Sequence, residues 1–204
     1  MVLWLSMLAL AGDCELRDGT YLVTVEPGSD VQTLFGHTAL LVYDEQQGGY
    51  SSIYEWGRFA QEPLASMAWK VLTMTKAYDL VARPLDDTVQ RYDRAGRGMM
   101  AQRLALSSEE QAALVSSVVE ELNAGEPFTY NWYQPNCTTQ VRDHLDTLLD
   151  GALREQLQGV GTSPAQEVLR HSAPHGPLWL GLQWGSGRYA VSYTHLTLPT
   201  IYSV

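Results

Sequence analysis

The feature that most limits what this chain can become is the segment at residues 130–139, Tyr-Asn-Trp-Tyr-Gln-Pro-Asn-Cys-Thr-Thr. It places Cys137, one of two cysteines, directly after Asn136, a residue type that caps helix N-termini well. Apolar residues then recur at helical spacing up to Gly151, which predicts a helix that begins at the cysteine. A thiol at a helix N-terminus is close to the positive end of the backbone dipole, which favours the thiolate. The pattern therefore predicts a nucleophile, and a small buried core residue is the alternative.

A thiol nucleophile needs a base, and the chain has five histidines. His37 opens the apolar run at residues 37–43, which predicts a buried strand. Packing at the start of a core strand would hold this imidazole rigidly, as general-base catalysis requires. His144 lies two helical turns beyond Cys137, about 10 Å along the axis, which is too far for direct proton transfer. His37 is the predicted base, and a histidine satisfied by a backbone carbonyl is the alternative.

A third residue should orient the imidazole. After a turn-rich loop, residues 50–59 predict a strand that returns beside the histidine strand. Glu55 in this strand comes back near His37, although a change of register by one residue would turn it to the opposite face. Tyr54 and the side chain of Asn136 are the alternatives for this role.

Three motifs stand out when these segments are taken together. They are Phe-Gly-His-Thr at residues 35–38, Tyr-x-x-Gly-x-Phe at residues 54–59, and Tyr-x-Trp-Tyr-x-x-Asn-Cys-Thr-Thr at residues 130–139. This combination resembles the Lnb N-terminal periplasmic domain family over roughly residues 21–184. The resemblance implies a relation to circularly permuted NlpC-like, papain-fold cysteine hydrolases, in which histidine precedes cysteine along the chain. It implies Cys137 as nucleophile and His37 as base, while a role for Glu55 follows with less force.

The substrate class rests on fold analogy. We expect a secreted or periplasmic hydrolase or acyltransferase that acts on an amide in a cell-wall peptide or, second, on a lipid ester. Aromatic and polar side chains near the motifs are predicted to line its cleft, although aromatic residues at such spacing are also common in cores: Tyr54, Trp56, Trp132, Tyr133 and Asn136. A non-catalytic cell-envelope binding module that keeps the fold is the alternative function.

Composition and pattern favour one α+β domain over residues 14–190. The chain has 204 residues, of which 45% are hydrophobic and 18% charged, enough to bury a sizeable core. Strands are expected at residues 21–25, 37–43, 50–59, 77–85 and 98–106. Helices are expected at residues 63–73, 86–95 (polar and exposed), 107–122, 137–149, 153–158 and 164–170. Strands and helices do not alternate regularly, which argues against a doubly wound sheet. The resemblance implies a permuted NlpC-type, papain-like fold with a small antiparallel sheet packed against helices.

Charge and ligand spacing exclude several partner classes. Thirteen basic against 23 acidic residues give a net charge of −10 without a cluster of lysines and arginines, which argues against nucleic-acid binding. The sequence has no Cys-x-x-Cys, and its one His-x-x-x-His spacing, His171 and His175, contains Pro174 and lies in a polar loop, so no metal is expected. A metal site made from His37, Cys137 and a carboxylate is the weaker alternative. No cofactor is expected either, because the sequence has no Walker loop and no dinucleotide fingerprint.

The two ends of the chain differ from its middle. Residues 1–13 resemble a truncated secretory signal that is too short for a stable transmembrane span, with a buried strand or helix as the alternative. We expect Cys14 and Cys137 both to remain reduced, because a disulfide would silence the nucleophile. Residues 191–204 resemble a translated sequencing adapter, so we expect an artefactual tail and a domain that is incomplete at its C-terminus. A genuine terminal strand is the alternative there.

Overall fold

The computed structural model describes residues 7–9, 16–29, 33–44, 51–59, 63, 66, 70, 75–130, 135–156, 170–173 and 176. The chain divides into two compact units. The first unit comprises residues 1–58 and 79–127, and the second comprises residues 59–78 and 128–204. Each unit is described by itself.

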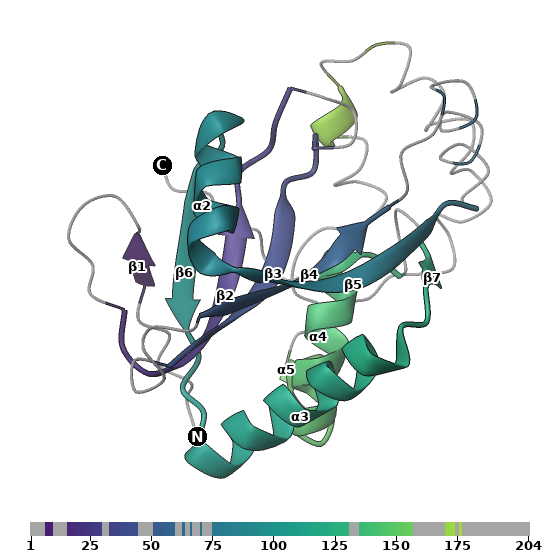
Figure 1. Ribbon diagram of the computed structural model, residues 1–204. Coiled ribbons are helices and arrows are strands. Elements are labelled where there is room, and N and C mark those ends of the chain that lie inside the picture. Colours follow the sequence, from purple (N-terminus) through teal and green to yellow (C-terminus); the bar gives the residue numbers. More distant parts are fainter. Residues whose placement is uncertain are drawn as a thin grey trace. The chain divides into compact units, whose positions relative to one another are not determined.

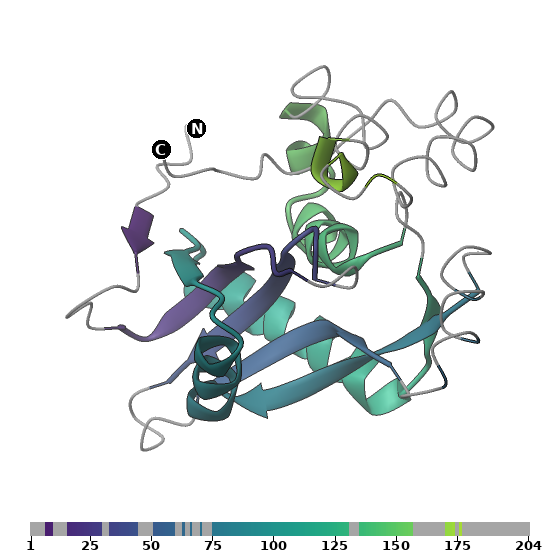
Figure 2. The same ribbon diagram turned by 90° about the horizontal axis from the view of Figure 1, so that it is seen from above.

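Six strands of the first unit form an antiparallel sheet within the described residues, in the order β1-β6-β2-β3-β4-β5. The strands are β1 (Met7–Ala9), β2 (Gly19–Val25), β3 (His37–Tyr43), β4 (Ser52–Arg58), β5 (Ala77–Pro84) and β6 (Met99–Arg103). β5 belongs to this unit from Asp79 onward. The strands β2, β3 and β4 lie side by side at the centre of the sheet (Figure 2).

Two helices of the first unit, α2 (Leu85–Arg94) and α3 (Ser108–Ala124), cover opposite faces of this sheet (Figure 1). Neighbouring residues of a strand point to opposite faces. On β4, the carboxylate of Glu55 accepts a hydrogen bond from the hydroxyl of Tyr92 on α2. The indole N–H of the next residue, Trp56, donates to Glu121 on α3 at 2.9 Å.

The core of the first unit lies under α2. Alternate residues of β2 and β3 supply most of it, together with one residue each from β4, α2 and β6: Tyr21, Val23, Val25, Ala39, Leu41, Ile53, Tyr92 and Ala101. β-Branched and aromatic side chains suit the pleated surface of a sheet. Burial of each large apolar side chain stabilises the fold by about 1.5–3 kcal/mol. This packing fixes the register that sets the face on which each polar residue of these strands lies.

Helix α3 begins at a capping box. The Ser107 hydroxyl accepts the N–H of Glu110 at 3.2 Å, and the Glu110 carboxylate accepts the N–H of Ser107 at 2.7 Å. These hydrogen bonds lower the pKa of Glu110. The helix ends at Gly125, whose φ of 63° lies in the left-handed region that glycine favours. The start predicted from Ser107 is confirmed.

The second unit contains the strand pair of β5 with β7 (Phe128–Thr129), where Tyr78 lies opposite Phe128. It also contains the helices α4 (Cys137–Leu148) and α5 (Ala152–Gln156). Aromatic rings gather at the start of β5: the centroid of the Tyr78 ring lies 4.6 Å from that of Tyr130 and 5.2 Å from that of Phe59.

The predicted α+β class, with an antiparallel sheet and helices, is confirmed. The helix predicted at residues 86–95 forms as α2, but its exposure is wrong in part, because Thr88 and Tyr92 are buried. The helices predicted at residues 63–73 and 164–170 lie almost wholly outside the described residues.

The predictions for the two ends of the chain concern residues that are mostly not described. Residues 7–9, within the predicted signal segment, form β1 and pair with β6. Cys14 and residues 191–204 lie outside the described part of the chain. Among the described helices, none has the length and apolar character needed to cross a bilayer.

Candidate active site

His37 is the first residue of β3, where it lies opposite Val25 on β2. The turn before it requires glycine. Gly36 has a φ of 72°, and a Cβ atom there would lie 2.7 Å from the carbonyl oxygen of Val25. This tight turn therefore fixes the position of His37 at the start of β3.

The structure brings His37 and Glu55 together. The Nε2 atom of His37 lies 3.6 Å from Oε1 of Glu55, with side-chain exposures of 14% and 5%. Both residues lie on the sheet face covered by α2, because His37 is in phase with the core residues Ala39 and Leu41. The predicted return strand therefore forms, and its register, which the sequence left open, places Glu55 on the same face as His37.

Helix α2 and strand β5 supply further partners to the Glu55 carboxylate. Nη2 of Arg91 donates to both carboxylate oxygens, at 2.7 and 2.6 Å, and the Tyr92 hydroxyl donates to Oε1 at 2.7 Å. Nε of Arg83 lies 3.4 Å from Oε2 and makes no hydrogen bond among the described residues. Burial acts to raise the pKa of Glu55, but the His37 charge, the Tyr92 hydroxyl and Arg91 together lower it. Glu55 is therefore held as a carboxylate.

Sequence reasoning missed Arg83, Arg91 and Tyr92. One signal for Tyr92 was present, because Leu85, Thr88 and Tyr92 recur at i, i+3 and i+7 and so mark an inward face on α2. For the two arginines there was none, since the sequence does not reveal that α2 returns over β4.

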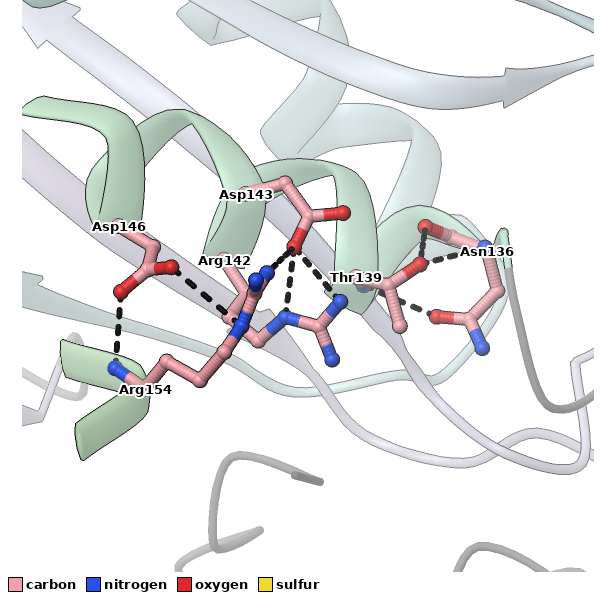
Figure 3. Close-up of polar contacts among 6 residues, drawn as sticks. All are labelled: Asn136, Thr139, Arg142, Asp143, Asp146 and Arg154. Carbon is pink, nitrogen blue, oxygen red and sulfur yellow. Dashed lines mark hydrogen bonds and ion pairs between the residues drawn. The ribbon is translucent and has the colours of Figure 1, made fainter. Parts of the chain in front are cut away.

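In the second unit, Cys137 is the first residue of α4. The start of this helix is fixed by a reciprocal pair: Thr139 N–H donates to Oδ1 of Asn136 at 3.0 Å, and Asn136 N–H donates to the Thr139 hydroxyl oxygen at 2.8 Å (Figure 3). The predicted N-cap is confirmed. Cys137 is reduced and half-buried, with Sγ 4.0 Å from the Thr138 hydroxyl oxygen.

Ion pairs and hydrogen bonds between charged side chains stabilise α4 beyond its first turn (Figure 3). The guanidinium of Arg142 is buried, and it donates to Asp143 at 2.6 and 2.8 Å. Asp146 accepts the backbone N–H of Arg154 at 2.8 Å and also pairs with its guanidinium at 3.4 Å. The contacts between Asp146 and Arg154 tie α4 to α5, so the helix that carries the thiol is held within its unit.

Two tyrosines of the second unit respond to the charge of Cys137. Burial, and then the negative charge of Cys137, raise the pKa of Tyr78 to about 12. The same two causes, followed by the charge of Tyr78, raise the pKa of Tyr130. Both phenols therefore keep their protons at neutral pH.

A family model described as the Lnb N-terminal periplasmic domain matches residues 13–171. The chain belongs to this family. The stated resemblance is thereby confirmed at the level of the family, and the predicted periplasmic location agrees with it. Comparisons with curated proteins and with solved structures return no match.

The remaining predicted site residues of this Lnb N-terminal domain are placed as follows. Tyr54 lies on the sheet face opposite Glu55, and burial raises its pKa. Trp56 is buried and bonded to α3. Asn136 caps α4, while Trp132 and Tyr133 lie outside the described residues. Within the described part of the domain, no group of three or more histidine, cysteine and carboxylate side chains could hold a metal ion.

Proposed function

We propose that this domain is a cysteine-dependent hydrolase or acyltransferase of the cell envelope, with Cys137 as nucleophile, His37 as base and Glu55 as the residue that orients the base. The observation that carries the proposal is the His37–Glu55 pair. A slightly exposed imidazole at the start of a core strand lies 3.6 Å from a buried carboxylate that is itself fixed by α2. A fixed carboxylate beside the imidazole supports the proposed role of Glu55, because catalytic triads use such a group to orient the base.

The ring nitrogen that lies nearer Glu55 supports a tautomer for the proposed reaction. Nε2 of His37 lies 3.6 Å from Oε1 of Glu55, where the carboxylate charge favours a proton on Nε2. Nδ1 is then the basic nitrogen. In the proposed reaction Nδ1 accepts the Cys137 proton and later returns it to the leaving nitrogen or oxygen.

The capped start of α4 supports Cys137 as the nucleophile. The helix dipole favours a thiolate at the first helical position, and Asn136 fixes the geometry of that turn. Sulfur attacks the carbonyl carbon of an amide or ester, and backbone N–H groups at the start of α4 stabilise the oxyanion. Water or a second acceptor then releases the acyl group.

Chain order supports the finer part of the proposal, a permuted NlpC-type, papain-like domain over residues 14–190. Histidine precedes cysteine, as the resemblance implies. By fold analogy the substrate is an amide of a cell-wall peptide, with a lipid ester second. Tyr54, Trp56, Trp132, Tyr133 and Asn136 remain the predicted substrate-binding residues.

The pH dependence of alkylation tests the pairing. We expect iodoacetamide to label the parent protein at Cys137 near neutral pH, with labelling lost in Cys137→Ala and kept in the matched control Cys14→Ala. His37→Ala should slow this alkylation by at least tenfold at pH 6.5 and little at pH 9.5, where the thiol ionises unaided. His144→Ala, on the same helix as the thiol, is the control for loss of a histidine.

Two results would overturn the proposal. One is equal alkylation rates in His37→Ala and His144→Ala at pH 6.5. The other is labelling that persists in Cys137→Ala and disappears in Cys14→Ala. Either result would favour the non-catalytic envelope-binding module.

A further inference from the structure

Basic side chains gather beside His37 in a chain whose net charge is −10. Arg83 and Arg91 both reach the carboxylate of Glu55, which is also the partner of His37. The guanidinium of Arg97 lies 5.0 Å from the ring centroid of Tyr92, and that of Arg91 lies 4.4 Å from the same centroid. We call Arg83 and Arg91 the arginine pair.

One carboxylate does not use the full capacity of two guanidiniums. Arg91 uses a single nitrogen, Nη2, for its hydrogen bonds to both carboxylate oxygens of Glu55. Arg83 approaches through Nε alone, at 3.4 Å and without a hydrogen bond among the described residues. Each guanidinium carries five N–H donors, so most of the donors of the arginine pair are not spent on Glu55.

The exposed fractions of the side chains show which charges are accessible to solvent. The side chain of Glu55 is 5% exposed, whereas those of Arg83 and Arg91 are 40% and 46% exposed. The negative charge is therefore buried beneath two half-exposed positive ones. Planar guanidinium forks bind carboxylate and phosphate oxygens in pairs.

We propose that Arg83 and Arg91 form an anion-binding subsite beside His37, which takes a carboxylate or phosphate group. As a statement about substrate it rests on the proposed function: the subsite selects acyl substrates that carry such a group near the bond to be cleaved. As a statement about binding it stands on the first unit alone, because both arginines, Glu55 and His37 belong to that unit.

The test is an NMR titration of the full chain with inorganic phosphate and, separately, with sodium acetate, against sodium chloride at equal ionic strength. We expect saturable shifts of the His37 ring and of the Arg83 and Arg91 side chains with at least one oxyanion and not with chloride. The stronger oxyanion identifies the preferred group.

Arg83→Gln should weaken the affinity for that oxyanion by about tenfold, as expected for loss of one charge-assisted contact. Arg103→Gln is the matched control, since it removes the same charge from β6, which three strands separate from β5, and there the Arg103 guanidinium donates to the carbonyl of Asp18. Circular dichroism checks the fold, and Arg83→Lys, which keeps the charge, should retain part of the binding.

Absence of saturable shifts would overturn the subsite, as would equal weakening by Arg83→Gln and Arg103→Gln. These results are separable from those on the thiol. Cys137→Ala should bind the oxyanion like the parent protein, so loss of thiol reactivity in His37→Ala bears on the catalytic proposal and loss of oxyanion binding bears on the subsite.

Discussion

The His37 ring lies against the bare backbone of Gly57: a Cβ atom built on that glycine would be 3.1 Å from Cε1 of the imidazole. Real Cβ contacts this short are uncommon, so a side chain at this position would displace the ring by a few tenths of an ångström. Contact with the His37 ring thus explains why the Tyr-x-x-Gly-x-Phe motif has glycine at this position. The missing side chain at Gly57 leaves room for the His37 imidazole beside β4, near the Glu55 carboxylate.

Gly57→Ala tests this contact. We expect the His37 ring to move, the Coulomb coupling to Glu55 to weaken, and the pKa of His37 to fall relative to the parent protein, as followed by NMR of the ring protons. Overpacking should also lower the free energy of unfolding by about 1 kcal/mol. Gly176→Ala is the control, because no atom of the described residues beyond its chain neighbours lies within 4 Å of a Cβ built there. An unchanged pKa of His37 in Gly57→Ala would show that the ring does not depend on this glycine.

Glu55→Gln should change how stability depends on pH. The folded protein lowers the pKa of Glu55 below its usual value of 4.5, because the His37 charge, Tyr92 and Arg91 together outweigh the opposing effect of burial. A lowered pKa contributes stability above pH 4.5 and loses it as the pH falls through the folded-state value. The parent protein should therefore lose stability more steeply than Glu55→Gln on acidification below pH 4.5, as measured by urea unfolding at a series of pH values.

Two variants bracket this result. Glu109→Gln, at an exposed position, is the control for loss of a carboxylate elsewhere in the first unit. Tyr92→Phe removes the 2.7 Å hydrogen bond to Glu55 and should shift the acid transition part of the way toward that of Glu55→Gln, at a cost of about 1 kcal/mol at neutral pH. Parallel slopes in the parent protein and Glu55→Gln would contradict the assigned role of the carboxylate.

The parts of this structure that sequence predicts well are those encoded locally. Capping of α3 by Ser107 and of α4 by Asn136 depends on residues three positions apart, and both starts were predicted. The approach of Glu55 to His37 needed one further condition, the hairpin register, which the buried residues Leu41 and Ile53 fix by lying opposite each other.

The rest of the site depends on tertiary packing. Arg91 and Tyr92 reach Glu55 because α2 returns over β4, and a short polar helix carries little information about the strand it covers. Arg83 reaches the carboxylate through the pairing of β5 with β4, where it lies opposite Ile53. Neither relation is a pattern within one segment. The partners that hold Glu55 as a carboxylate were therefore not predictable.

Cys137→Ser should lower the pKa of Tyr78. Burial is the first cause of its value of about 12, and the negative charge of Cys137 is the second. Serine keeps the size of the side chain and does not ionise in this range, so only the second cause is removed. NMR titration of the Tyr78 ring should give a pKa below that of the parent protein, and Thr138→Val, at the neighbouring residue, should leave it unchanged. No difference between Cys137→Ser and the parent protein would mean that the thiolate does not act on this ring.

Asn136→Ala should weaken α4 at the residue where the thiol lies. The substitution removes the acceptor for the Thr139 N–H, which costs about 1 kcal/mol of unfolding free energy, and it loosens the turn that aligns the first N–H groups toward Cys137. We expect the pKa of the thiol to rise and the rate of its reaction with iodoacetamide at pH 7 to fall several-fold, with little change at pH 9.5. Asn136→Ser keeps a capping oxygen without adding charge, so it should restore most of the rate. If Asn136→Ala and Asn136→Ser react at the same rate as the parent protein, the cap does not govern the thiol, and the helix dipole argument for Cys137 fails.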